Sequence, residues 1–230
     1  MLEAKKLVMR YDEKLALNEL SFSVAPGEIF CLLGQNGAGK TTTINIFLGL
    51  IKPTFGDALI NNTSIKENHS IKNFIAYIPE IVQLYGNLSG LENLDFFSRL
   101  AGFKYTEQEL SKYLNKANLQ PEAFKKKLNT YSKGMRQKVG IAIALAKNAS
   151  YILMDEPTSG LDPKASVEFA TVCKELSANG VGILMATHDI FNAVNIGSKI
   201  GIMREGTLVH QTETSKISAQ ELQDLYIKTI

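Results

Sequence analysis

Apolar and polar positions alternate with a period of about two through the opening third of the chain, and this alternation predicts strands. Near-continuous apolar runs return in the last third, and such runs are typical of parallel strands that are covered on both faces of a sheet. We expect strands at residues 5–11, 20–24, 28–34, 57–62, 74–78, 151–157, 180–188 and 199–206.

The pattern changes to a helical one between residues 91 and 149. Apolar side chains recur at a spacing near 3.6 at Leu91, Leu94, Phe97 and Leu100. Thr106 followed three residues later by a glutamate is a capping signal for the next helix. We expect helices at residues 40–50, 91–102, 106–119, 134–148, 163–176 and 218–228.

These elements predict an α/β fold with an N-terminal antiparallel β subdomain, a mixed or parallel central sheet and a helical insert. The 230 residues fit a single domain, 1–230, with a helical subdomain at roughly 84–150. Hydrophobic residues make up 45% of the chain, which is ordinary for a globular protein with a core.

Charge and apolar content narrow the class of protein. A net charge of +2, from 25 basic and 23 acidic residues, gives no electrostatic case for a nucleic-acid partner. Cys31 and Cys173 lie in apolar segments without metal-ligand spacing, so we expect buried thiols in a reducing compartment. The most apolar helical run, 139–146, is far shorter than the ~20 residues that span a bilayer. We therefore expect a cytoplasmic chain that reaches a membrane only through another protein.

A phosphate-binding loop stands at residues 34–42, Gly-Gln-Asn-Gly-Ala-Gly-Lys-Thr-Thr. It fits G-x-x-x-x-G-K-[ST], with a strand before it and a helix after it. The glycines let backbone amides face an anion, and the helix adds its positive N-terminal dipole. We expect Lys40 to reach the β and γ phosphates and the Thr41 hydroxyl to bind Mg²⁺.

Two adjacent acids, Asp155 and Glu156, end the apolar strand at 151–157. Open α/β sheets bind ligands at the carboxyl ends of their strands, and charges rarely lie there without a partner. Asp155 is suited to Mg²⁺, and Glu156 is suited to polarise a water for attack on a γ-phosphate.

A second anion site is possible at residues 131–137, Tyr-Ser-Lys-Gly-Met-Arg-Gln, where an apolar helix begins. Ser132 offers a hydroxyl, and Gly134 offers an unhindered amide. One nucleotide does not need two complete cradles, so the second cradle would close on a nucleotide held by another subunit. The alternative is an ordinary capped helix, because serine is a common N-cap.

Taken together, the motifs resemble those of ATP-binding-cassette (ABC) proteins, in particular ABC-2 or exporter-like ATP-binding subunits, in order and over essentially the whole chain. Tyr11 stands where that family has an aromatic residue that stacks on adenine. The loop at 34–42, the signature motif at 131–137 and the strand at 152–157 follow in order. Ser159 to Asp162 match the family's D-loop, and His188 matches its switch histidine.

The resemblance implies an ATPase of the P-loop NTPase class, with ATP and Mg²⁺ as cofactors, that dimerises on ATP and powers separate membrane permease subunits from the cytoplasmic face. Two subunits, most simply a homodimer, would hold two ATP molecules between them. The residues it assigns are Glu156 and His188 for catalysis; Tyr11, Asn36, Gly37, Ala38, Gly39, Lys40, Thr41 and Thr42 for the nucleotide; Ser132, Gly134 and Gln137 for the partner's nucleotide; Asp162 at the interface; and Thr41, Glu80 and Asp155 for the metal.

Three positions, in two motifs, depart from the family pattern. Glu80 replaces the usual glutamine after Tyr-x-Pro, which places a negative charge beside the triphosphate. Lys133 and Met135 change the usual Ser-Gly-Gly-Gln signature while leaving Ser132 and Gly134 in place. We hypothesise that Glu80 retains the linking role of the glutamine with an altered metal dependence.

Other functions remain alternatives. A soluble ABC ATPase of iron–sulfur cofactor assembly or nucleic-acid maintenance shares these motifs, although the chain has no coiled-coil insert and no second cassette. A small-molecule kinase would have no use for residues 131–137.

The resemblance also implies that the segment 80–97 lies at the docking groove of a membrane partner, with Leu84 and Tyr85 as candidate contacts. The alternative is that this segment belongs to the core of the helical subdomain.

Overall fold

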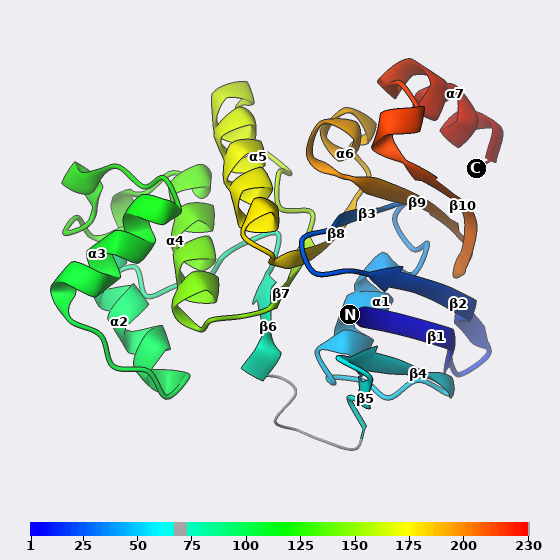
Figure 1. The fold of residues 1–230 in the computed structure, drawn as a ribbon, viewed down its shortest axis with the longest axis horizontal. Helices are drawn as coiled ribbons and strands as arrows, with labels where there is room; N and C mark the ends of the chain where they lie inside the picture. The colour runs from blue at the N-terminus through cyan, green and yellow to red at the C-terminus, as the bar shows by residue number, and fades with distance from the viewer. Residues whose placement is uncertain (67–72, 230) are drawn as a thin grey trace.

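A computed structural model describes residues 1–66 and 73–229, and two sheets organise this part of the chain (Figure 1). The larger sheet has six strands in the order β10-β9-β3-β8-β7-β6. Its strands are β3 (Ile29–Leu33), β6 (Ile75–Ile78), β7 (Tyr151–Asp155), β8 (Gly182–Thr187), β9 (Lys199–Arg204) and β10 (Thr207–Glu213). The first five run parallel, and β10 pairs antiparallel with β9 at one edge.

Strand β3 explains why the middle of this sheet is a continuous apolar run. Ile29, Cys31 and Leu33 face one hydrophobic core, and Phe30 and Leu32 face another. Each face of the strand is covered, so every position is buried. Cys31 is buried as expected, and so is Cys173.

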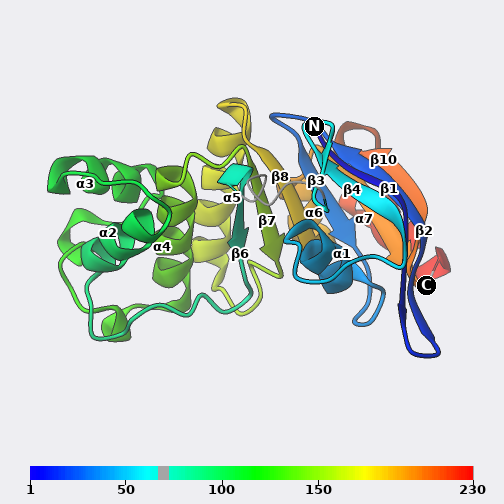
Figure 2. The same ribbon diagram turned by 90° about the horizontal axis from the view of Figure 1, so that it is seen from below.

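The smaller sheet is antiparallel, in the order β2-β1-β4-β5, and forms the N-terminal β subdomain. Its strands are β1 (Leu2–Tyr11), β2 (Lys14–Val24), β4 (Phe55–Ile60) and β5 (Thr63–Ser64). Helix α1 (Lys40–Phe47) packs between the two sheets, against β2 and β4 on one side and β7 and β8 on the other (Figure 2). This arrangement fixes the start of α1 beside the carboxyl ends of the central strands.

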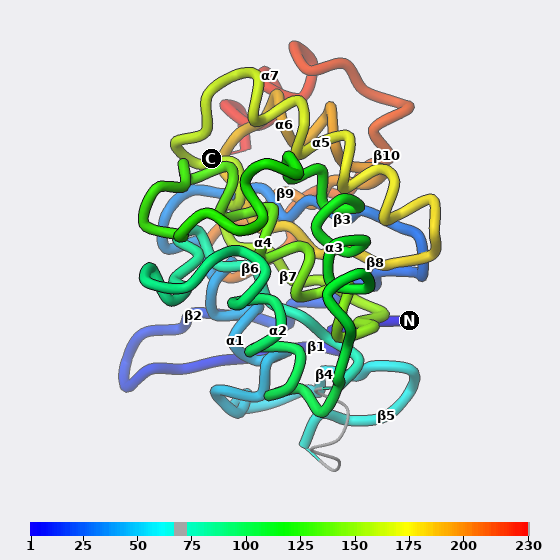
Figure 3. The backbone as a smooth tube through the Cα atoms, turned by 90° about the vertical axis from the view of Figure 1, so that its left-hand side faces the viewer, coloured from blue at the N-terminus to red at the C-terminus, as the bar shows by residue number. Residues whose placement is uncertain are grey.

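Three helices form the predicted insert at one end of the molecule, and Figure 3 views the protein from that end. They are α2 (Gly90–Leu100), α3 (Glu107–Lys116) and α4 (Lys133–Ala146). Reciprocal capping boxes start the first two, with Ser89 and Glu92 at α2 and Thr106 and Glu109 at α3. Helix α4 also packs on β6 and on α5 (Pro163–Ala178), which joins the insert to the central sheet.

Helix α5 shares its face of the central sheet with two further helices, α6 (Ile190–Ile196) and α7 (Ala219–Thr229). The structure differs from the sequence predictions in detail: α1 ends at Phe47 and not at residue 50, and α6 and β10 were not predicted. Among the residues that the structure describes, no helix combines the length and apolar character that crossing a bilayer requires.

Candidate active site

The phosphate loop joins β3 to α1, and its glycines have backbone conformations that other residues rarely adopt. Gly37 has φ +86° and Gly39 has φ +107°. A Cβ on Gly39 would also lie 2.7 Å from the carbonyl oxygen of Ala16 and from side-chain atoms of Leu17 and Met203. The loop therefore adopts its shape only with glycine at position 39.

A cavity of about 420 Å³ opens in front of this loop. Most of the predicted nucleotide and metal residues line it, and so does the predicted catalytic residue Glu156. The others are Tyr11, Asn36, Gly37, Gly39, Lys40, Thr41, Thr42, Glu80 and Asp155. Ala38 does not, because its side chain is 6% exposed and packs in the core behind the loop. Lys14, Ala16 and Gln35 line the cavity without having been predicted. Lys14 arrives there because it pairs with Tyr11 across the β1–β2 hairpin, a register that the sequence pattern did not define.

Lys40 is buried, and its ammonium group is surrounded by oxygen atoms. Its Nζ donates to the carbonyl oxygen of Gly34 at 2.6 Å and to that of Gln35 at 3.2 Å. Glu156 Oε1 lies 3.6 Å from the same nitrogen. A cation fixed at the entrance of a helix N-terminus is suited to hold a phosphate group.

Asp155 and Thr41 meet at the carboxyl end of β7, where the Thr41 hydroxyl donates to Asp155 Oδ2 at 2.9 Å. Burial, together with the negative charges of Glu156 and Glu80, raises the pKa of Asp155, although the Thr41 hydroxyl and Lys40 act in the opposite direction. The described residues contain no group of three or more His, Cys, Asp or Glu side chains suited to a metal. Mg²⁺ held through a nucleotide needs only one or two carboxylates besides phosphate and water, so this pair of hard oxygen donors fits it.

Glu156 stands one residue further along in a strained backbone conformation, with φ +44°. Its Oε2 accepts hydrogen bonds from the Thr187 hydroxyl at 3.2 Å and from the His188 amide at 3.3 Å. His188 Nδ1 lies 2.9 Å from the same oxygen. Oε1 is buried and, among the described residues, has no hydrogen-bond partner. The structure thus brings the two predicted catalytic side chains together and leaves one carboxylate oxygen for a further group.

Glu80 follows β6 and joins the cavity to the helical insert. Its Oε1 accepts a hydrogen bond from the Ser159 hydroxyl at 2.9 Å and lies 4.0 Å from Lys133 Nζ on α4. The side chain is half exposed. The position after Tyr-x-Pro therefore contacts both the D-loop and the signature motif of the same chain.

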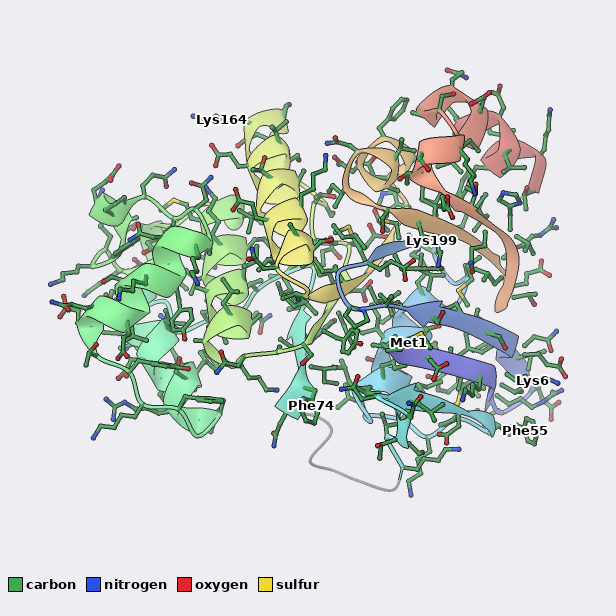
Figure 4. The ribbon with its side chains drawn as sticks, viewed as in Figure 1. Met1, Lys6, Phe55, Phe74, Lys164 and Lys199 are labelled. Carbon is green, nitrogen blue, oxygen red and sulfur yellow. The ribbon has the colours of Figure 1, made fainter. Side chains whose placement is uncertain are left out.

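The second predicted anion site is a separate hollow of about 200 Å³, which Ser132, Gly134 and Asp162 line together. Ser132 caps α4 by accepting from the Met135 amide, and Asp162 caps α5 by accepting from the Ala165 amide. A Cβ on Gly134 would come within 3.2 Å of the Ala165 Cβ, so this glycine also permits close packing of the two helices. Figure 4 shows Lys164, in the first turn of α5, pointing outward from this end of the helix.

The position of Gln137 differs from the prediction that this residue contacts the partner's nucleotide. Its side chain is 1% exposed, and its Nε2 donates to the backbone carbonyl oxygens of Glu80 and Pro157, both at 3.2 Å. This buried position does not suit contact with a partner's nucleotide. Because Gln137 lies five residues beyond the N-cap Ser132, the helix turns it toward the interior, and it holds the segments that follow β6 and β7 against α4.

Comparison with known proteins identifies the family. A family model described as ABC transporter matches residues 17–159. The chain is 35% identical over 219 residues to the bacitracin transport ATP-binding protein BcrA of Enterococcus faecalis, covering 94% of this chain and 70% of the relative. It is 32% identical over 212 residues to the linearmycin resistance ATP-binding protein LnrL of Bacillus subtilis, covering 91% of this chain and 68% of the relative.

Solved structures agree with the sequence relatives. An ATP-binding subunit of an ABC transporter superposes with a TM-score of 0.83 at 31% identity, covering 99% of this chain and 98% of that one. An ATP-binding cassette in a dimeric post-hydrolysis state with ADP and Pi gives a TM-score of 0.81 at 28% identity, covering 93% of this chain and 99% of that one. These relatives favour a transporter subunit over the alternative of a soluble ATPase of cofactor assembly or nucleic-acid maintenance, because the named relatives are transporter subunits. The chain therefore belongs to the ABC transporter family and is an ATP-binding, ATP-hydrolysing transporter subunit.

Proposed function

We propose that the cavity in front of the phosphate loop holds ATP, and that Glu156 is the general base of its hydrolysis. One observation carries this assignment: Lys40, Asp155, Glu156 and Thr41 surround a single cavity whose backbone frame is the glycine-rich loop. In this arrangement Tyr11 stacks on adenine at the outer end. Lys40 exchanges its present carbonyl and carboxylate partners for the β and γ phosphates.

The proton path follows from the contacts of Glu156. Its Oε1, without a hydrogen bond among the described residues, accepts the proton of the attacking water. Its Oε2 is held by Thr187 and by the His188 amide, so the carboxylate keeps its orientation. His188 has 58% of its side chain exposed beside this carboxylate, which leaves its ring free to turn toward the γ-phosphate.

Thr41 and Asp155 would hold Mg²⁺, with Glu80 at the edge of the same cavity. When bound, the ion neutralises phosphate charge and orients the γ-phosphate. Among the described residues that line the cavity, three are acids, Glu80, Asp155 and Glu156, and two are basic, Lys14 and Lys40. The free cavity therefore carries an excess of negative charge that favours a divalent cation.

We further propose a homodimer of single-domain chains in which Ser132 and Gly134 close on the ATP of the partner, with Asp162 beside the interface. The hollow that these residues share lies apart from the nucleotide cavity of the same chain, which supports a role toward a second molecule. Two solved structures of one related cassette are dimeric.

A permease would dock on the apolar surface between the insert and the central sheet, at the cytoplasmic face of the membrane. An apolar groove of about 600 Å³ lies there, with Leu50, Tyr77, Phe97 and Leu100 in its wall. Tyr85 is 49% exposed and packs on Phe96 and Phe97 beside it, whereas Leu84 is partly buried against the core. The names of the relatives, a bacitracin transport protein and a linearmycin resistance protein, favour an export system.

Equilibrium binding of ATP tests the cavity assignment. Lys40→Ala should abolish tight ATP binding because it removes the buried cation that faces the phosphates. Lys116→Ala, on the exposed side of α3, is the matched control and should bind as the unmodified protein does. Unchanged affinity in Lys40→Ala would contradict the assignment.

A further inference from the structure

Lys133 stands in the signature motif, yet the proposed hydrolysis makes no use of it. Its ammonium group points back into its own chain: Nζ lies 4.0 Å from Glu80 Oε1, and a Cβ on Gly160 would lie 3.6 Å from the same nitrogen. The side chain is 32% exposed. Lys133 therefore lies beside both the segment that follows β6 and the D-loop.

Three segments from distant parts of the chain meet at this point, and we call their meeting place the junction: Glu80, Lys133, Gln137 and Ser159. The Ser159 hydroxyl donates to Glu80 Oε1, which is also the oxygen nearest Lys133. Gln137 Nε2 donates to the backbone of Glu80 underneath. The carboxylate of Glu80 is thus held from the D-loop and from α4, while its backbone is tied to α4.

The same Glu80 side chain lines the nucleotide cavity. A carboxylate in this place adds negative charge where Asp155 and Glu156 already contribute two, and where the triphosphate of ATP must enter. These carboxylates and the triphosphate carry like charges, and like charges repel more strongly near a protein surface than in bulk water. Lys133 is the cation of the junction that lies beside this carboxylate, and it is not among the residues that line the cavity.

We propose that Lys133 is a positioning residue for Glu80. By pairing with the Glu80 carboxylate, Lys133 orients this carboxylate toward Ser159 and offsets its negative charge, so that ATP can bind in the cavity next to it. The proposal rests on the assignment of the cavity to ATP. It links two of the three departures from the family pattern, because the negative charge added at position 80 is compensated by the positive charge added at position 133.

The expected effect is modest, since the pair is partly exposed and water screens it. Exposed ion pairs contribute up to about 1 kcal/mol, which corresponds to about a fivefold change in an equilibrium constant. What distinguishes this proposal is that the effect of Lys133 on ATP binding depends on the residue at position 80. Lys133 should matter for ATP only when an acid stands at position 80.

A double-mutant cycle on equilibrium ATP binding tests this dependence. Affinity for ATP is measured in EDTA, without Mg²⁺, for the unmodified protein, Lys133→Ser, Glu80→Gln and the double variant. Lys133→Ser should weaken ATP binding about two- to fivefold. Glu80→Gln should tighten it, and adding Lys133→Ser to Glu80→Gln should change nothing further. Lys133→Arg should retain the affinity of the unmodified protein, and Lys116→Ser is the control for loss of a remote lysine.

Other outcomes separate the possible failures. Equal weakening by Lys133→Ser with Glu80 present or replaced would mean that Lys133 acts on the nucleotide directly, and would overturn the proposal. So would no effect of Lys133→Ser at all. Melting temperatures of the four nucleotide-free proteins identify a merely structural role, in which stability changes and ATP affinity does not. If the unmodified protein does not bind ATP, or Lys40→Ala binds it equally well, the cavity assignment itself fails.

Discussion

At the scale of single residues, the site is built around Glu156, whose two oxygens have different surroundings. One is held by Thr187 and the His188 amide, and the other lies 3.6 Å from Lys40 without a hydrogen bond among the described residues. The left-handed backbone at this residue turns its carboxylate from the strand end toward the cavity. Because these contacts hold the carboxylate in place before a nucleotide arrives, we propose that the chemical step depends on it.

Glu156→Gln should slow ATP hydrolysis by about 10²–10⁴-fold, or about 3–5 kcal/mol of barrier, because an amide cannot accept the proton of water. Steady-state phosphate release is the measurement, with Glu175→Gln on the exposed side of α5 as the control. Turnover close to that of the unmodified protein would remove Glu156 from the role of base.

Asp155 links the charge of the site to the stability of the free protein. Burial chiefly raises its pKa, so above that raised pKa the charged form lowers the free energy of unfolding. As pH falls through the raised pKa toward the ordinary value of 3.8, the folded chain binds a proton that the unfolded chain does not, and the penalty disappears.

Asp155→Asn should therefore raise the melting temperature of the nucleotide-free protein at neutral pH and flatten its pH dependence on the acid side, while weakening Mg-ATP binding. Calorimetric melting from pH 7 to pH 4 checks the first effect, and binding with and without Mg²⁺ checks the second. A lower melting temperature at neutral pH would contradict this account of the carboxylate cluster.

At the scale of elements, the phosphate loop is the part that the sequence predicted best. One motif predicted its glycines, the strand before it and the helix after it, because Gly37 and Gly39 are required locally by their positive φ angles.

Gly39→Ala should destabilise the fold and abolish ATP binding, since its Cβ would overlap a backbone oxygen. Gly37→Ala meets nothing within 4 Å and should cost only about 1–2 kcal/mol of left-handed backbone strain. Thermal melting of both variants tests the contrast, and equal losses would contradict it.

Elements without a strong period were harder to predict. Helix α6 has seven residues, too few for a clear apolar repeat, and it starts from an Asp189 cap. Strand β10 is a half-exposed edge strand, so its sequence need not alternate. The burial of Gln137 is a matter of helix rotation against β6 and β7, and no local pattern at residues 131–137 reveals which face packs inward.

At the scale of the whole molecule, the two candidate anion sites occupy different surfaces of one chain. The sequence motifs predicted both sites, but only the fold shows how far they lie apart on one chain, because their separation depends on how the helical insert packs on α5. We propose that a second subunit completes each nucleotide site, so that the dimer is the working unit, and that closure of this dimer on ATP drives the movement of an attached permease.

The most direct test is size-exclusion chromatography of Glu156→Gln with and without Mg-ATP, beside the double variant Glu156→Gln/Ser132→Arg. We predict a dimer that forms only with ATP and that the double variant does not form, because the arginine side chain would occupy the surface that closes on the partner's nucleotide. A further double variant, Glu156→Gln/Ser111→Arg, changes a partly exposed serine on α3 and should still dimerise. ATP-dependent dimers that persist with Ser132→Arg would contradict the account.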